Sequence, residues 1–235
     1  MKKNDLVIGV LGGMGTYATI NLFQEYASIF KAEKEWDRPR IIIDNRCTMP
    51  SRVRAYLYHE KVQELVNEMA ESMEYLSSAG CTKIILACMT SHLFLPKIYK
   101  KVPQVKNKVI NLIDNCAKYI KEDQIKEVYL LGSEGTIESK VFQSALDKYN
   151  IKCLFPTKDD YQIMRECIEA VKQNKYSDTI KEQFLSLINR SPYVILGCTE
   201  LPILYRKYAN DIKCKKAYDP LSLGLETLKK EFKND

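Results

Sequence analysis

Two cysteines occupy matching positions in the sequence, each directly after a run of aliphatic residues. Cys198 follows residues 194–197 and precedes a threonine and a glutamate, and Cys88 follows residues 83–87. Aliphatic runs of this kind are typical of buried parallel strands, so each thiol is expected where a strand ends and leads into a helix. The dipole and the free N–H groups of a helix start stabilise a thiolate. Both cysteines are therefore candidates for acid and base chemistry.

Two thiols on opposite faces of a bound molecule can remove a proton from one side and deliver one to the other. This pair of steps inverts a stereocentre without a cofactor. The α-hydrogen of an amino acid is a very weak acid, so the site must also stabilise the developing carbanion. Hydroxyl groups and backbone N–H groups around the substrate carboxylate help to do this. Thr90, Ser91 and Thr199 stand beside the two cysteines and suit that role.

The elements that must position these residues alternate along the chain, which predicts an α/β fold with parallel sheets. Strands are expected at residues 6–11, 40–44, 83–87, 127–131, 151–155 and 194–197. Helices are expected at residues 17–34, 59–78, 109–122, 134–149, 159–174, 177–189 and 221–232.

An internal repeat indicates how these elements are grouped. The pattern L-G-x-x-G-T occurs at residues 11–16 and again at 131–136, and a cysteine strand follows each copy. Two matches in the same order predict two similar Rossmann-like or flavodoxin-like lobes with parallel sheets. Residues 1–100 with 212–235 are expected to form the lobe that carries Cys88, and residues 101–211 the lobe that carries Cys198. Ligands bind at the carboxyl ends of open α/β sheets, so the active site is expected in the cleft between the lobes.

A glycine-rich turn follows the first expected strand. The spacing of Gly9, Gly12, Gly13 and Gly15 does not match the GxGxxG pattern of dinucleotide sites. Glycine at the end of a strand does allow the backbone to approach a ligand closely. Gly13 and Met14 are therefore candidate substrate contacts, and a purely structural tight turn is the alternative.

The composition excludes several classes of protein. The 235 residues contain no apolar run near the ~20 that a membrane span needs, and residues 6–11 suit a first strand better than a signal peptide. The net charge of +6 favours a small anionic substrate, and the lysines of residues 97–108 lack the aromatic interleaving of nucleic-acid binders. A soluble, cytoplasmic protein that binds neither membranes nor nucleic acid is expected.

The eight cysteines form no CxxC pair, and the chain has only two histidines, His59 and His92. Neither disulfides nor a zinc site is therefore expected, and the thiols suit a reducing compartment. Cys81, Cys116 and Cys167 stand at positions that suit small buried hydrophobic residues.

The chain resembles the aspartate/glutamate racemase family, and within it the aspartate racemases more than the cell-wall glutamate racemases. The resemblance covers nearly the whole chain and is carried by residues 8–15, 131–139 and 196–202. Glutamate racemases usually have a histidine after the second Cys-Thr, where this chain has Glu200. The resemblance implies an enzyme that needs no pyridoxal phosphate or other cofactor and no metal, acts on an acidic amino acid and forms homodimers. By motif match, Cys88 and Cys198 are its opposed acid and base.

The segment from Asn45 to Arg52 resembles a family loop in which an asparagine is followed by Pro-Asp-Arg. Arg52 is in register with the arginine that typically binds the side-chain carboxylate of the substrate, a task that suits a bidentate guanidinium. A surface ion pair is the alternative for Arg52, and more so for Arg46 and Arg54. Ser51 replaces the aspartate of the family loop.

Other residues depart from the family pattern or allow two interpretations. The family motif Cys-Asn-Thr is Cys-Met-Thr here, and Met89 cannot make the hydrogen bond of an asparagine to the substrate. The resemblance also places a lysine in the helix around Met164. His92 could tune the Cys88 thiol or simply pack in the lobe. Glu200 could orient Cys198 or be an ordinary acid at a helix start.

These departures leave the substrate open, and with it two alternatives to an acidic amino-acid racemase. Relatives of this architecture include maleate cis-trans isomerases, hydantoin racemases and arylmalonate decarboxylases, which act on other small molecules. Two thiols at matching turns favour racemisation over the one-cysteine decarboxylases. A non-catalytic anion-binding or sensory protein is the third interpretation.

Overall fold

The computed structural model describes residues 6–233 and confirms the α/β class with parallel strands in two separate sheets. The chain divides into two compact units, one of Met1–Leu112 with Leu221–Asp235 and one of Ile113–Pro220. The domain division expected at residues 100/101 and 211/212 stays a prediction.

The first unit contains a three-stranded parallel sheet in the order β2-β1-β3. Its strands are β1 (Val7–Gly12), β2 (Arg40–Asn45) and β3 (Lys83–Leu86). β1 is the central strand, and its residues Ile8, Val10 and Leu11 are fully buried. Burial of successive residues, which point to opposite faces, requires cover on both faces of the sheet.

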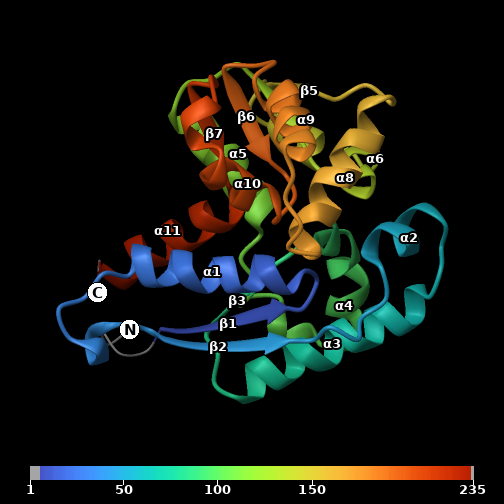
Figure 1. Ribbon diagram of the computed structural model, residues 1–235. Helices are drawn as coiled ribbons and strands as arrows, with labels where there is room; N and C mark the ends of the chain where they lie inside the picture. Colours follow the sequence, from blue (N-terminus) through green and yellow to red (C-terminus); the bar gives the residue numbers. More distant parts are fainter. Residues whose placement is uncertain (1–5, 234–235) are drawn as a thin grey trace. The chain divides into compact units, whose positions relative to one another are not determined.

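Helices supply that cover. Figure 1 shows α1 on one face of the first sheet and α3 on the other, with α11 beside α1. The hydroxyl of Ser222 in α11 donates to Glu25 in α1 at 3.1 Å. The α-helices of this unit are α1 (Thr16–Ile29), α2 (Arg52–Leu57), α3 (Val62–Ser78), α4 (Leu95–Lys101) and α11 (Pro220–Lys233). The 3-10 helices are η1 (Glu35–Asp37), η2 (Thr90–Phe94) and η3 (Pro103–Val105).

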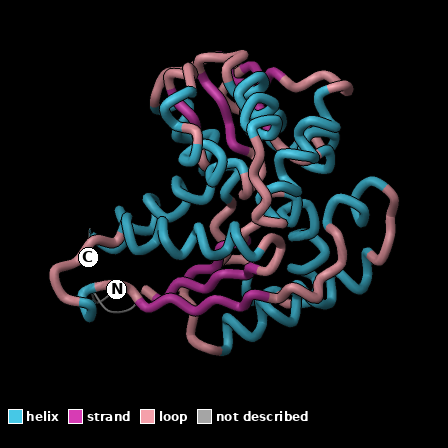
Figure 2. The backbone as a smooth tube through the Cα atoms, in the orientation of Figure 1, coloured by secondary structure: helices cyan, strands magenta, loops and turns pink. Residues whose placement is uncertain are grey.

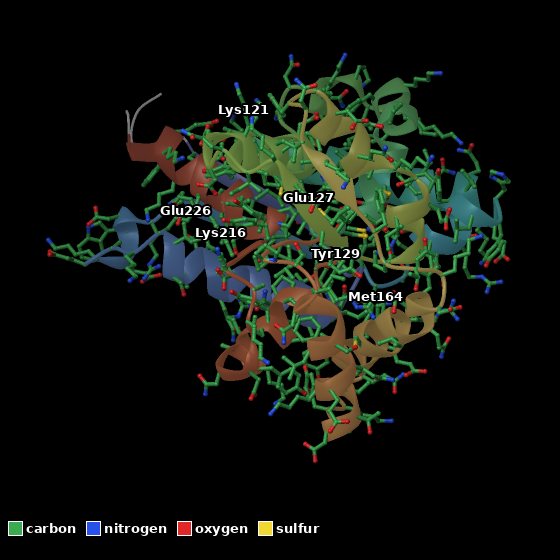
Figure 3. All side chains as sticks on the ribbon, turned by 90° about the horizontal axis from the view of Figure 1, so that it is seen from above. Lys121, Glu127, Tyr129, Met164, Lys216 and Glu226 are labelled. Atoms are coloured by element: carbon green, nitrogen blue, oxygen red, sulfur yellow. The ribbon has the colours of Figure 1, made fainter. Side chains whose placement is uncertain are left out.

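The second unit contains a four-stranded parallel sheet in the order β5-β4-β6-β7. Its strands are β4 (Glu127–Leu131), β5 (Lys152–Leu154), β6 (Tyr193–Leu196) and β7 (Lys216–Tyr218). Its helices are α5 (Leu112–Glu122), α6 (Glu134–Glu138), α7 (Val141–Asp147), α8 (Asp160–Lys172), α9 (Asp178–Ile188), α10 (Leu201–Lys207) and the 3-10 helix η4 (Ala209–Asp211). Figure 2 shows this alternation of strands and helices along the backbone. The core of this unit includes Tyr129 of β4 and Met164 of α8, both labelled in Figure 3.

Several expected elements have different bounds in the structure; the helix expected over 17–34, for example, ends at Ile29. Arg52 belongs to helix α2 rather than to a loop, because the Ser51 hydroxyl accepts the Arg54 N–H at 3.3 Å and caps a helix there. The helix expected from residue 59 begins at 62, since His59 and Lys61 have positive φ angles. The helix expected over 134–149 is two helices, separated at Lys140, where φ is 54°.

Helix α4 and strand β7 are among the elements not expected from the sequence. Helix α4 starts at Leu95, one residue before a proline that occupies the first turn and so leaves the helix intact. Strand β7 has only three residues, Lys216–Tyr218, and pairs with the edge of β6. Neither has the length or the periodicity that identifies an element from sequence.

An ion pair fixes the start of α8 in the second unit. Asp160 is 6% exposed. Arg190 donates to both of its carboxylate oxygens, from Nη1 to Oδ2 at 2.6 Å and from Nη2 to Oδ1 at 2.9 Å. The backbone N–H and the hydroxyl of Thr157 also donate to Oδ2, at 2.8 and 2.7 Å. The hydrogen bonds from Arg190 outweigh the effect of burial and lower the pKa of Asp160 from 3.8 to about 2.

This pair predicts a pH dependence of stability. The contribution of Asp160 is complete above pH 4 and is lost as the pH falls through about 2, because the carboxylate must then be protonated. Arg190 is 42% exposed, so solvent screening limits the loss in Asp160→Asn to about 1–2 kcal/mol of unfolding free energy at pH 7. Urea unfolding at pH 7 and pH 2.5 measures it. The neighbouring exposed Asp159→Asn is the control; an equal loss in both variants, or a loss undiminished at pH 2.5, would contradict the role of the pair.

Candidate active site

The carboxyl ends of β1, β2 and β3 bring most of the predicted site residues of the first unit to one edge of its sheet. The parallel register pairs Gly12 with Asn45 and Leu11 with Leu86. The residues that follow each strand therefore start from the same edge. Those residues are Gly13, Met14, Asn45, Cys88, Met89, Thr90 and Ser91.

The turn that carries Cys88 is held by its own backbone carbonyl. The Ser91 hydroxyl donates to the Cys88 carbonyl oxygen at 2.6 Å, and His92 Nδ1 lies 3.1 Å from the same oxygen. His92 Nε2 in turn lies 3.5 Å from the backbone nitrogen of Leu112. A neutral imidazole with its proton on Nδ1 satisfies both contacts. His92 thus contacts the backbone of the thiol-bearing turn.

Met89 and Thr90 lie inside the protein. Met89 is 2% exposed and Thr90 is 3% exposed, whereas Cys88 is half-buried. The place of the family asparagine is therefore occupied by a buried thioether, which offers only a weak acceptor to a ligand.

Arg52 is hydrogen-bonded to the turn after β1 and to its own segment. Its Nη2 donates to the Met14 carbonyl at 2.8 Å and its Nη1 to the Pro50 carbonyl at 3.1 Å. Its Nε is buried without an acceptor. Over residues 6–233 the structure shows no carboxylate within ion-pair distance of Arg52. These backbone bonds orient the guanidinium and leave N–H groups for an anion.

The two neighbouring arginines have carboxylate partners. Arg46 pairs with Asp44, Glu68 and Glu71 at 3.4, 3.1 and 3.1 Å. Arg54 forms a bidentate pair with a glutamate through Nε and Nη2, both at 2.7 Å. Of the three arginines in this segment, Arg52 is the one suited to bind a further carboxylate.

Two other predicted contacts are engaged within the first unit. The N–H of Gly13 donates to the Thr19 hydroxyl at 3.1 Å. The amide of Asn45, which is exposed, donates to Cys47 Sγ at 3.1 Å and to the Thr16 hydroxyl at 3.4 Å. The Gly13 N–H therefore stabilises the turn, and the exposed Asn45 amide lies beside the thiol of Cys47.

In the second unit, Cys198 lies where β6 ends and α10 begins, as expected. The preceding Gly197 donates its N–H to the Leu131 carbonyl at 2.6 Å, and a Cβ there would lie 2.9 Å from that backbone oxygen and 2.6 Å from a methyl group of Leu130. Only glycine allows the chain to pass so close to β4. Thr199 and Glu200 are 4% and 2% exposed and complete the turn.

Cys198 contacts a carboxylate. Its thiol lies 2.9 Å from Glu200 Oε2, and the Thr199 hydroxyl donates to the same oxygen at 3.3 Å. This direct contact supports the interpretation that Glu200 orients Cys198.

Lys172, at the end of α8, was not identified from the sequence. Its pKa is affected by the charges of Glu200 and Cys198, so it lies near both. Met164, where the resemblance placed a lysine, is 2% exposed in the core two turns earlier on the same helix. The amphipathic pattern of α8 assigns Lys172 only to the polar face, which gives no signal of a site.

The remaining cysteines differ from Cys88 and Cys198. Cys81, Cys116 and Cys167 are fully buried, as the sequence predicted, and burial raises the pKa of the Cys167 thiol to about 12. Such thiols stay protonated and act as small hydrophobic residues. All eight cysteines are unbridged. The described part of the chain contains no group of three or more His, Cys, Asp or Glu side chains placed to hold a metal ion. None of its helices combines the length and apolar character needed to cross a membrane.

Comparisons with known proteins support the fold and the family. The structure of an aspartate racemase from Picrophilus torridus superposes with a TM-score of 0.81 at 28% identity, covering 97% of this chain and 94% of that one. A glutamate racemase from Francisella tularensis in complex with D-glutamate gives a TM-score of 0.69 at 18% identity, covering 99% and 82%, and so shares the fold. The broad specificity amino-acid racemase RacX of Bacillus subtilis is 24% identical over 205 residues, 83% of this chain and 86% of its own. The model of the family described as Asp/Glu/hydantoin racemase matches residues 11–228, and the chain belongs to that family.

Proposed function

We propose that this protein is a cofactor-independent amino-acid racemase that uses Cys88 and Cys198 as opposed base and acid. The observation that carries the proposal is the pair of half-buried thiols at the carboxyl ends of β3 and β6, each in a turn held by polar contacts. Family membership supports the reaction class.

In the proposed reaction, one cysteine thiolate takes the α-proton and becomes a thiol. The other cysteine, a thiol at the start, gives its proton to the opposite face of Cα and becomes a thiolate. No electrons leave the substrate and no group is transferred, so the steps balance without a redox partner. Each general acid or base of this kind contributes about 10²–10⁴-fold to a rate. The mechanism requires both thiols to reach the same carbon atom from opposite sides.

We further propose that the substrate carries a second carboxylate, which Arg52 binds. The guanidinium of Arg52 is oriented by the Met14 and Pro50 carbonyls. The neighbouring Arg46 and Arg54, in contrast, are already paired with carboxylates. Aspartate and glutamate are the simplest such amino acids, and they are the substrates named for two of the matching racemases.

The buried Met89 favours a site that discriminates less among amino acids. An asparagine at that place could donate and accept hydrogen bonds, and a thioether cannot donate any. The match to a broad specificity racemase is consistent with this. The substrate range of the protein is therefore expected to extend beyond one acid.

Chiral chromatography tests the function. The purified protein is incubated with single enantiomers of aspartate, glutamate, asparagine, alanine and lysine, without pyridoxal phosphate. Appearance of the opposite enantiomer, fastest for an acidic amino acid, is expected. Inversion of hydantoins alone, or release of CO₂ from a malonate without racemisation of any amino acid, would assign the fold to one of the other reactions.

Replacing Arg52 tests the substrate class. Arg52→Lys keeps the charge but loses the bidentate geometry, so we expect KM for an acidic substrate to rise about tenfold or more, with a smaller change in kcat. KM for alanine is expected to stay within twofold, because alanine has no second carboxylate. Arg54→Lys is the matched control. A rise in KM that is equal for alanine and the acidic substrate would contradict the assignment of Arg52.

A further inference from the structure

The side chain of Glu200 lies against the proposed catalytic thiol of the second unit. The Cys198 thiol is 2.9 Å from Glu200 Oε2, a hydrogen-bond distance at which the thiol donates and the carboxylate accepts. Glu200 is 2% exposed, and its other oxygen, Oε1, is buried without a hydrogen-bond donor among the residues that the structure describes. Water therefore screens the carboxylate charge very little at the sulfur atom.

A cation, Lys172, lies near this pair. Burial lowers the pKa of Lys172, but the hydrogen bond to Glu169 and the charges of Glu200 and Cys198 more than offset burial, so its pKa is raised. Lys172 Nζ donates to Glu169 Oε1 at 2.8 Å, and its side chain is 37% exposed. Lys172 is therefore an ammonium that is shared between Glu169 and the charges near Cys198.

The charges near Cys198 disfavour a thiolate. The charged groups near it include Glu200 at the start of α10, and Lys172 with its partner Glu169 on α8. A thiolate at Cys198 would place a second negative charge 2.9 Å from the Glu200 carboxylate. Like charges at such a distance hold a proton on one of the two groups.

We propose that Glu200, opposed by Lys172, keeps Cys198 protonated in the resting protein, so that Cys198 is the proton donor and Cys88 the base when a substrate first binds. Glu200 is then a positioning residue that acts through Cys198. The Cys88 turn differs, because a hydroxyl and an imidazole contact its backbone carbonyl. The two thiols are thus unequal before any substrate arrives.

The consequence for catalysis rests on the proposed function. The resting protein is ready for the enantiomer whose α-hydrogen faces Cys88, and the other enantiomer requires the proton to move first. Since two enantiomers have equal free energies in solution, kcat/KM must be equal in the two directions. The inequality of the thiols therefore appears as different values of kcat and KM for the two enantiomers.

Alkylation by iodoacetamide tests the proposal without any substrate. The rate at each cysteine is measured by peptide mass spectrometry between pH 6 and 10, since only the thiolate reacts. In the intact protein Cys198 is expected to react slowly at neutral pH. In Glu200→Gln the carboxylate charge is removed, so alkylation of Cys198 at pH 7 is expected to be about tenfold faster, with Cys88 unchanged.

A second variant keeps the test decisive if Glu200→Gln does not fold. Lys172→Met removes the opposing cation and is expected to slow alkylation of Cys198 about threefold or more. The control for Glu200→Gln is Glu166→Gln, a glutamate of α8 that is bound by Gln162 and Gln183. The control for Lys172→Met is Lys181→Met, which also removes a paired lysine. Slower alkylation in Glu200→Gln would mean that Glu200 takes the proton from Cys198, and no change would mean that it does not act on the thiol. Either result overturns the proposal, and neither depends on whether the protein racemises an amino acid.

Discussion

Replacing either Cys88 or Cys198 with alanine is expected to reduce racemisation at least about a hundredfold, and up to ~10⁴-fold. Each thiol supplies one half of the proton transfer, and alanine can neither take nor give a proton. Because both halves are needed for inversion, the effects of the two substitutions are not expected to multiply. The double variant is expected to racemise at about the rate of the slower single variant. The measurement is the initial rate of appearance of the opposite enantiomer in each direction.

Cys214→Ala is the matched control for this pair. Cys214 is also a half-buried thiol, but it lies beyond α10, away from the carboxyl end of β6. Its variant is expected to keep the rate of the unaltered protein within twofold. Near-normal racemisation by Cys88→Ala or by Cys198→Ala would rule out the two-thiol mechanism.

Replacing Gly13 with alanine is expected to lower the free energy of unfolding by about 3 kcal/mol. The φ angle of Gly13 is +77°, in the region that L side chains rarely adopt, and an added Cβ would lie 2.3 Å from the backbone carbon of Arg46. Neither the turn after β1 nor the segment after β2 can move without breaking the register of the two strands. Gly13 therefore holds together the turn that supplies the Met14 carbonyl to Arg52.

Gly80 provides the comparison, because it has a similar φ of +92° but nothing within 4 Å of the position of a Cβ. Gly80→Ala carries the cost of the left-handed conformation alone, about 1 kcal/mol. Urea unfolding followed by circular dichroism measures both variants. Equal losses would show that crowding at Gly13 contributes nothing, and that its role is conformational only.

The sequence identified the parts of this fold that follow from hydrophobic runs and strand-end motifs. The aliphatic runs before Cys88 and Cys198 are the buried strands β3 and β6, and Glu200 precedes α10 as expected. Gly80 ends α3 with a positive φ. These features depend on local chemistry and on burial periodicity, which a sequence records directly.

Features that depend on tertiary contacts were not predicted. The edge strand β7 is three residues long and is stabilised by pairing with β6, so it has no pattern of its own. Lys172 is one lysine among many on polar helix faces, and only its place near Cys198 distinguishes it. The family register already favoured Arg52 over Arg46 and Arg54, but the glutamates that pair with those two arginines lie elsewhere in the chain and required the structure.

The most direct test of the account is deuterium exchange at Cα. The protein is incubated with L-aspartate, and separately with L-glutamate, in heavy water without pyridoxal phosphate, while label and chirality are followed together. The two-thiol mechanism predicts that the D-enantiomer, as it first appears, carries deuterium at Cα, because the proton delivered to the second face comes from a thiol that has exchanged with solvent. D-enantiomer that forms without label, or no exchange and no inversion with either acid or with any amino acid of the wider panel, would contradict the proposed function.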